Sequence, residues 1–328
     1  MSRSVIPYEI VVSGRSGRGM RHAQHGLTLI ELMISITLGM AIVAAGLMVL
    51  VSTKSTYVIQ DENTRLSDTG RYAIENISRA VRQAAFENLE SEDAPIVHDP
   101  DNAANAPNID GFDAKTMSVT TGSLTPLPGA MTVNPSDILQ VRFFGASKKD
   151  VSGTPTPDGS IINCAGRAVG AVQTPENANE GRGWSIFFVH RANGGEPQLF
   201  CAYVDGGKLV SAPIASGVES FQVLYGLDTN NDGVPEQFLN ATDVKNRWRN
   251  VVALKIAMLV RSGRSERADV EDKVYDLFGP AYDEATDKGS RVSEAALPQA
   301  ERARTRKIFS TLIQLRNRAS GANIAPIQ

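Results

Sequence analysis

The sequence predicts an α+β protein in which one long N-terminal helix precedes an antiparallel β-sheet domain. The first observation is a helical pattern without proline from Lys54 to Phe86, which directly follows an apolar segment. The second is a series of short runs rich in Val, Ile, Phe and Leu in the rest of the chain, separated by turn residues. Strands that follow a helix, rather than alternating with helices, favour an α+β fold.

The composition limits the classes of function. The chain has 328 residues, of which 42% are hydrophobic, and a formal net charge of −3. These values allow a hydrophobic core and argue against a general nucleic-acid binder with a basic surface. The four histidines leave little room for a histidine-based metal catalyst.

The N-terminal segment changes abruptly from basic to apolar. Residues 1–26 carry four arginines and one acidic residue, and Leu27–Val51 is an apolar segment whose last 20 residues carry no charge. A helix of about 20 such residues spans a bilayer core. The basic flank predicts the cytoplasmic side, so we expect the chain after Val51 to lie outside the cytoplasm. We also expect translation to start at Met20, with residues 1–19 an artefact of start-site assignment.

Glu31 lies inside the apolar segment. Neither a plain membrane anchor nor a removable secretion signal accounts for an acidic residue at this position. A carboxylate at that depth costs a few kcal/mol unless it is paired, and a plain single-pass anchor has no use for it. A removable secretion signal would be shorter and would be followed by a small-residue cleavage site, which residues 52–63 lack. The position of Glu31 therefore predicts a functional role.

The string GLTLIEL, Gly26–Leu32, resembles the prepilin-peptidase site of type IV pilins and type II secretion pseudopilins. These families place Gly before the cut, an apolar residue after it, most often Phe, and Glu at the fifth mature position, which is Glu31 counted from Leu27. The resemblance implies a leader over residues 1–26, cleavage after Gly26 and methylation of the Leu27 amine. In a filament, Glu31 would then neutralise the amine of a neighbouring subunit, because ion pairs are strong in low-dielectric surroundings.

The helical pattern continues beyond the apolar segment. Apolar residues after Lys54 recur at helical spacing, with charged residues opposite them. We therefore expect one helix from residue 27 to about 88, with a transmembrane or filament-core half over residues 27–53 and an amphipathic half over residues 54–88. The second half would pack on a globular domain, residues 89–328. Gly70 is expected to be its weak point.

The globular domain is predicted to be rich in strands. Residues 87–113 are rich in Asn, Asp, Ala and Pro and predict a surface loop, while residues 269–304 predict a polar excursion with a short helix. The segments of strand length are 137–145, 184–191, 198–204, 218–227, 251–261 and 307–315.

The chain has two cysteines, Cys164 and Cys201, both after the membrane segment. An isolated pair in an oxidising compartment usually forms a disulfide, which stabilises a domain by about 2–4 kcal/mol. The alternative is two buried free thiols. A catalytic cysteine is not expected, because neither residue lies in a histidine-rich context.

A polar segment after the predicted strand 218–227 resembles the first half of a calcium loop. It lacks the bidentate Glu at position twelve, where Leu239 stands, and the flanking helices are missing. A tight turn stabilised by Asp and Asn side chains explains the same residues without a metal. Calcium is therefore the one cofactor that the sequence suggests, and the turn is the alternative. The predicted ligands are Asp228, Asn230, Asp232, Val234 through its carbonyl, and Glu236.

No enzymatic motif is present, because the sequence lacks a G-x-S-x-G elbow, a Walker loop, H-E-x-x-H and G-x-G-x-x-G. We therefore expect a protein that is not an enzyme. The histidines beyond the leader, His98 and His190, are expected at surface or strand-edge positions. Two basic clusters are expected to be solvated charges rather than nucleic-acid sites. They are Lys245, Arg247 and Arg249, and Arg302, Arg304, Arg306 and Lys307.

Three further segments resemble PilW-type minor type IV pilins, which are related to J-type pseudopilins. The segments are Val251–Ser262, Arg306–Arg318 and Asn63–Phe86. The resemblance implies a type IV pilin-like fold and a role in type IV pilus assembly. The implied partners are other minor pilins, the major pilin, prepilin peptidase, the assembly platform and inner-membrane lipid. The implied location is the inner membrane, with a single pass and a periplasmic C-terminal domain, and the pilus tip after assembly.

Three alternatives stay open. One is a J-type pseudopilin of type II secretion, which has the same N-terminal motif. Another is a membrane-tethered periplasmic enzyme, and the third is a tip adhesin or DNA receptor. Residues 90–240 show no resemblance that separates them.

Overall fold

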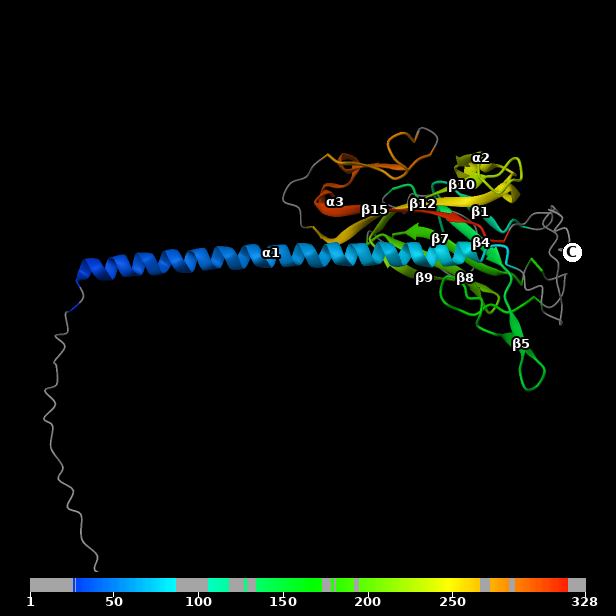
Figure 1. The fold of residues 1–328 in the computed structure, drawn as a ribbon, viewed down its shortest axis with the longest axis horizontal. Coiled ribbons are helices and arrows are strands. Elements are labelled where there is room, and N and C mark those ends of the chain that lie inside the picture. Colours follow the sequence, from blue (N-terminus) through cyan, green and yellow to red (C-terminus); the bar gives the residue numbers. More distant parts are fainter. Residues whose placement is uncertain are drawn as a thin grey trace, which may run out of the picture. The chain divides into compact units, whose positions relative to one another are not determined.

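The computed structural model describes Gly26 and residues 28–86, 106–117, 127–128, 134–172, 178–179, 181–191, 195–265, 272–282 and 287–317. It divides after Thr56 into two compact units. In the first, the described chain is mainly the N-terminal part of helix α1 (Leu29–Arg82). The second begins at Tyr57 and holds the rest of α1 and the strands (Figure 1).

Helix α1 ends at Arg82, earlier than the predicted residue 88. Ala85 has a positive φ of 56°, and its N–H donates to the carbonyl of Arg142 over 3.2 Å. The Phe86 carbonyl accepts from the N–H of Phe144 over 2.9 Å. The chain therefore leaves the helix because its backbone hydrogen-bonds to the end of a strand instead.

Gly70 is buried, and α1 is continuous through it. A Cβ atom at this position would clash with the ring of Phe309 on strand β15 (Arg304–Gln314). The missing side chain therefore lets an aromatic ring of the sheet approach the helix backbone. Gly70, which was predicted to weaken the helix, is therefore the residue at which helix and sheet make a close contact.

Two larger antiparallel sheets are present among the described residues. One has five strands in the order β1-β4-β7-β8-β9, and the other has four in the order β11-β10-β12-β15. The strands of the first are β1 (Ile109–Phe112), β4 (Ile138–Phe143), β7 (Gly183–His190), β8 (Gln198–Asp205) and β9 (Lys208–Ser216). Those of the second, besides β15, are β10 (Val218–Leu227), β11 (Gln237–Leu239) and β12 (Val251–Ser265).

Smaller elements decorate these sheets. Three two-stranded pairs occur in the described chain, and short helical turns follow β11 and precede β15. The pairs are β2 (Lys115–Thr116) with β3 (Leu127–Pro128), β5 (Ser147–Lys149) with β6 (Pro155–Pro157), and β13 (Val274–Asp276) with β14 (Arg291–Ser293). The turns are α2 (Ala241–Val244), η3 (Trp248–Asn250), η5 (Glu294–Ala296) and α3 (Gln299–Arg302).

The main core lies between the two larger sheets and the part of α1 in the second unit. Ile77 and Val81 of α1 join a cluster that includes Phe187 of β7 and Phe221 of β10, all fully buried. Successive side chains of a strand point to opposite faces. Alternate residues of β12 accordingly enter the main core, while Leu259 enters a second cluster with residues of β13 and β14. The four-stranded sheet is therefore covered on both faces.

The architecture confirms the α+β prediction. Each of the six predicted strands overlaps a strand of the structure, namely β4, β7, β8, β10, β12 and β15. The prediction of a surface loop over residues 87–113 was wrong at its C-terminal end, where β1 forms and pairs with β4. Residues 87–105 of this predicted loop lie outside the described residues. The excursion contains the expected short helix, α3, and also the β13–β14 pair.

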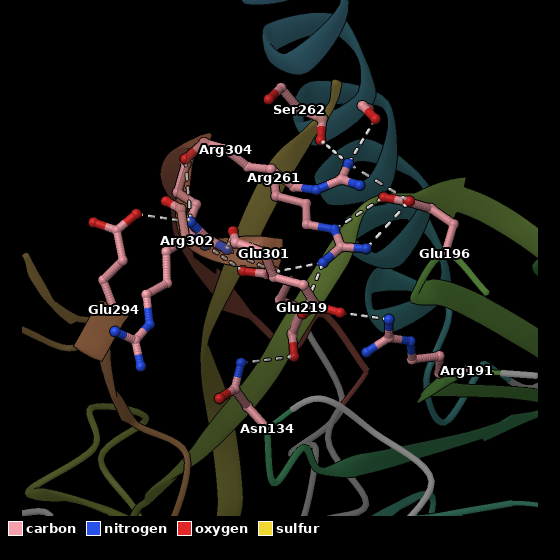
Figure 2. A network of polar contacts seen from close by, with 12 residues as sticks. Asn134, Arg191, Glu196, Glu219, Arg261, Ser262, Glu294, Glu301, Arg302 and Arg304 are labelled. Carbon is pink, nitrogen blue, oxygen red and sulfur yellow. Dashed lines mark hydrogen bonds and ion pairs between the residues drawn. The ribbon is translucent and has the colours of Figure 1, made fainter. Parts of the chain in front are cut away.

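A buried ion-pair network joins the four-stranded sheet to the segments around it (Figure 2). At its centre, Glu219 of β10 and Arg306 of β15 are both fully buried. The Arg306 Nε and Nη2 atoms donate to the two carboxylate oxygens of Glu219 over 2.6 and 3.1 Å, and its Nη1 atom donates to Glu294 over 2.9 Å. Such bidentate pairs combine charge neutralisation with fixed geometry.

A second arginine, Arg261 of β12, extends the network. Its Nη1 atom lies 3.0 Å from Glu219 and 3.1 Å from Glu301 of α3, and its Nε and Nη2 atoms donate to Glu196 over 3.0 and 3.2 Å. Arg191, which follows β7, pairs with Glu301. The network therefore links β10, β12, β15, α3 and segments flanking β7 and β8 through charges of opposite sign.

We predict that Glu219→Gln destabilises the domain strongly. The variant keeps the size of the side chain but leaves Arg261 and Arg306 without their shared carboxylate, and breaking a buried pair on one side costs about 3–5 kcal/mol. Denaturant unfolding of the detergent-solubilised chain measures this loss. The matched control is Asp61→Asn, which breaks an exposed pair with Arg65 on α1 and is expected to cost about 0.5 kcal/mol or less. Equal losses in the two variants would contradict the assignment.

Candidate assembly site

The N-terminus of α1 is organised by Thr28. Its Oγ1 atom accepts from the N–H of Glu31 over 3.3 Å, and its carbonyl accepts from the N–H of Leu32 over 3.1 Å. A hydroxyl that accepts from the third residue after it is a typical N-cap and satisfies one of the free N–H groups of the first turn. Gly26 is exposed, and Leu27 lies outside the described residues. Helix α1 therefore begins at Leu29, three residues after Gly26.

The first unit presents an uncovered apolar helix. Every described residue from Thr28 to Thr56 is exposed, including Leu29 at 76% and Met48 at 73%. This part of α1 is long and apolar enough to cross a membrane. Its Ser and Thr hydroxyls donate to carbonyls one turn earlier, as Ser35 does to Glu31 over 2.7 Å. Such internal satisfaction of polar groups suits a lipid-facing helix.

Glu31 is the acidic residue in the first turn of this helix. It is exposed, and its carboxylate forms no hydrogen bond or ion pair with the described part of the chain. An unpaired carboxylate on an apolar helix needs a positive partner when lipid or other helices cover it. The geometry therefore leaves Glu31 available to another molecule.

The cysteines are joined in a disulfide between Cys164 and Cys201 of β8, which agrees with the prediction. The segment that holds Cys164 also contacts α1, because Asn76 Nδ2 donates to the Cys164 carbonyl over 3.2 Å. The Cys164 N–H donates to the Ser185 hydroxyl of β7 over 3.0 Å. The disulfide thus fastens a loop that lies against both the helix and the five-stranded sheet.

The predicted calcium ligands form a turn held by its own hydrogen bonds. The two carboxylate oxygens of Asp228 accept from the N–H groups of Asn231 and Gly233 over 2.6 and 2.7 Å. Asp232 accepts from the Val234 N–H over 2.8 Å. Carboxylate oxygens of Asp228, Asp232 and Glu236 lie within 4.8 Å of one another. The three acids thus lie close enough together to bind one cation. Their hydrogen bonds to backbone N–H groups also fit the alternative, a tight turn without a metal.

Two expectations for surface residues were wrong. His190 ends β7 but is only 4% exposed, and its ring meets Phe200 edge-on at 5.8 Å. Burial lowers the pKa of this imidazole. Arg306 is not a solvated charge but the fully buried centre of the ion-pair network. His98 lies outside the described residues.

The other basic residues divide between surface and structure. Lys245 and Arg247 are exposed, as expected. Arg302 is half-buried and donates to the carbonyls of Leu297 and Ala295 over 2.9 and 2.7 Å. The second basic cluster therefore includes residues whose contacts stabilise the domain. Substitutions of these residues are expected to impair folding, so they are poor tests of nucleic-acid binding.

Two protein families are similar to parts of this chain. A family model described as prokaryotic N-terminal methylation motif matches residues 21–47, and one described as type IV pilus-assembly protein W, PilW, matches residues 186–317. No curated protein matches the chain. A solved structure of a type IV-like pilin from Thermus thermophilus is similar, with 17% identity, a TM-score of 0.27, and coverage of 63% of this chain and 84% of that chain.

The two family matches fall on the two regions that the structure marks out. The methylation motif covers Gly26, Glu31 and the start of the exposed apolar helix, and the PilW match covers β8–β12 and β15 with all the ion-pair residues named above. Together they support a PilW-type minor pilin, a protein of type IV pilus assembly, over these two regions of the chain.

Proposed function

We propose that this protein is a non-catalytic minor pilin that enters the filament through its N-terminal helix and primes pilus assembly at the tip. The observation that carries the proposal is Glu31, an exposed and unpaired carboxylate in the first turn of an apolar helix. The PilW match and the methylation motif support the same role. Other minor pilins and the major pilin are the proposed partners.

The sequence of events follows from the chemistry of the first turn. Before assembly, the apolar helix would hold the protein in the inner membrane with its C-terminal domain in the periplasm. Prepilin peptidase would cut after Gly26 and methylate Leu27, which creates a free amine one helical turn from Glu31. In a bundle of such helices, Glu31 of one subunit would neutralise the amine of its neighbour and fix the axial register.

The size of the globular domain supports a place at the tip. The second unit alone runs from Tyr57 to Gln328. A domain this large on every subunit would strain a thin helical lattice, whereas a single copy at the end has room. We therefore propose that the domain caps the filament rather than repeating along it, and that it acts as a structural part rather than an enzyme.

We predict that prepilin peptidase removes residues 1–26. Intact-mass spectrometry of the chain from peptidase-positive cells is expected to show a mature N-terminus at Leu27 with one added methyl group. The same measurement in peptidase-null cells is expected to show the uncut chain. The control within the chain is Gly26→Val, which alters only the residue before the cut. This variant is expected to stay uncut in peptidase-positive cells. A chain of equal mass in both strains would contradict the processing step.

Glu31→Gln is expected to block assembly without blocking processing. The variant keeps the shape of the side chain but removes the negative charge, and one-sided loss of a buried pair costs about 3–5 kcal/mol, enough to lower pilus number by about tenfold or more. Counting surface pili by electron microscopy measures the effect. The control is Glu75→Gln, an exposed acid further along α1. Unchanged pili with impaired protein secretion would instead support the J-type pseudopilin alternative.

The calcium prediction for the Asp228 loop has a separate test. If calcium joins the carboxylates of Asp228, Asp232 and Glu236, removing a charged ligand lowers affinity, because calcium affinity follows the number of charged ligands. Isothermal titration is then expected to show weaker calcium binding by Asp232→Asn than by the unmodified chain. Identical titrations of the two proteins would leave the loop as a turn held by hydrogen bonds alone.

A further inference from the structure

A second acidic cluster, unrelated to the N-terminal motif, lies in the globular domain. It consists of Asp113 just after β1, Asp137 just before β4, and Asp287 between β13 and β14. One carboxylate oxygen from each lies within 4.8 Å of the others. Asp137 and Asp287 are buried, at 1% and 0% exposure, and Asp113 is half-buried. Three distant segments of the chain therefore place three carboxyl groups at one point.

Only neutral groups donate hydrogen bonds to these carboxylates among the described residues. Asp113 accepts from the N–H groups of Ala241 and Thr242 over 2.8 and 2.7 Å. Asp137 accepts from the N–H groups of Ala114 and Val223 over 3.2 and 2.9 Å. The Tyr282 hydroxyl donates to Asp287 Oδ2 over 2.8 Å. Five neutral donors orient the three carboxylates but do not balance three negative charges.

No lysine or arginine in the described chain forms an ion pair with any of the three aspartates. Lys115 and Lys245 line a groove that also contains Asp113, without pairing to the cluster. Burial, and then the neighbouring aspartates, raise the pKa of Asp137 well above its ordinary value. Carboxylates crowded in this way in a low-dielectric site either take up protons or bind a cation.

In the part of the chain that the structure describes, two of the buried polar atoms beside the cluster lack a hydrogen-bond partner. One is Asp287 Oδ1, in a side chain with no exposed surface. The other is the hydroxyl of Tyr225, also fully buried, which lies against Gly111 and the carbonyl of Ile138. Burial, and then the charges of Asp137 and Asp113, raise the pKa of this hydroxyl well above its ordinary value. A buried polar atom without a partner is costly, so it indicates a ligand or ordered water.

We propose that Asp113, Asp137 and Asp287 form a binding site for one calcium ion. Calcium takes oxygen ligands at about 2.3–2.6 Å, so oxygens around one ion lie up to about 5 Å apart, which agrees with the spacing of this cluster. Magnesium keeps several of its waters and is seldom bound by protein ligands alone. Asp287 Oδ1 supplies a free oxygen, and Asp113 also lines a groove, from which water would fill the remaining positions.

The site would lock the excursion between β12 and β15 onto the rest of the domain. Gly289, with a φ of 98°, lies against the carbonyl of Pro135, and the Ser220 hydroxyl donates to the Gly289 carbonyl over 3.1 Å. These contacts already hold the segment of Asp287 beside β4 and β10. A calcium ion adds a link of opposite charge between this segment and the five-stranded sheet, so its expected effect is stabilisation of the domain.

The test uses the full chain in detergent, with calcium alone and then terbium as probes. Calcium up to about 10 mM, above the usual range of extracellular calcium modules, is expected to raise the melting temperature by several degrees. Terbium is expected to emit under tyrosine excitation, because Tyr282 contacts Asp287. Asp287→Asn is expected to weaken both responses at least about tenfold, since calcium affinity follows the charge count of its ligands.

The matched control is Asp205→Asn, an exposed aspartate outside both acidic clusters, which is expected to leave both responses intact. If Asp287→Asn does not fold, Asp113→Asn removes the half-buried charge in its place. A melting temperature of the unmodified chain that ignores calcium would overturn the proposal. So would a response lost in Asp232→Asn but kept in Asp287→Asn. Stabilisation by Asp287→Asn in chelator, with no further calcium response in either protein, would show that the carboxyls share protons instead.

Discussion

The domain depends on the pairing of Glu219 with two arginines from neighbouring strands. Arg261 and Arg306 both donate to the same buried carboxylate, at 3.0 and 2.6 Å, so neither the acid nor the bases are tolerable without the others. The pairing fixes the order β10-β12-β15 by charge as well as by backbone hydrogen bonds. It also attaches α3 and the segment of Glu196, which joins the four-stranded sheet to the strands of the other sheet.

The same electrostatic rule operates differently in the two units. In the ion-pair network of the domain, the buried charges are matched within one chain. On the N-terminal part of α1, Glu31 has no partner in the described chain, and the apolar residues around it are uncovered. A charge that is satisfied internally stabilises a fold, whereas one that is left unsatisfied on an apolar surface specifies a partner. This contrast separates the part that folds from the part that assembles.

The sequence was most informative where periodicity or a local motif decides the structure. The first part of strand β12, residues 251–260, is a nearly continuous apolar run because both of its faces are buried, and Glu31 stands out because an acid interrupts an apolar segment. Strand β9 was missed because its residues are only partly buried, although Gly206 and Gly207 mark the hairpin turn before it. Arg306, Asp137 and Asp287 could not be placed, because their partners lie far away in the sequence and only the tertiary fold brings them together.

The position of Arg306 near the end of the chain has a consequence for biogenesis. Glu219 and Arg261 are made long before Glu301 and Arg306, so a partly synthesised chain carries Glu219 with only one of its two arginines, and β12 lacks its outer neighbour. Domains emerge in order during synthesis, but this one cannot close its second sheet until residues 301–314 have appeared. Chains interrupted before that point have an unpaired edge on β12. We expect proteases to remove such incomplete chains more readily than complete ones.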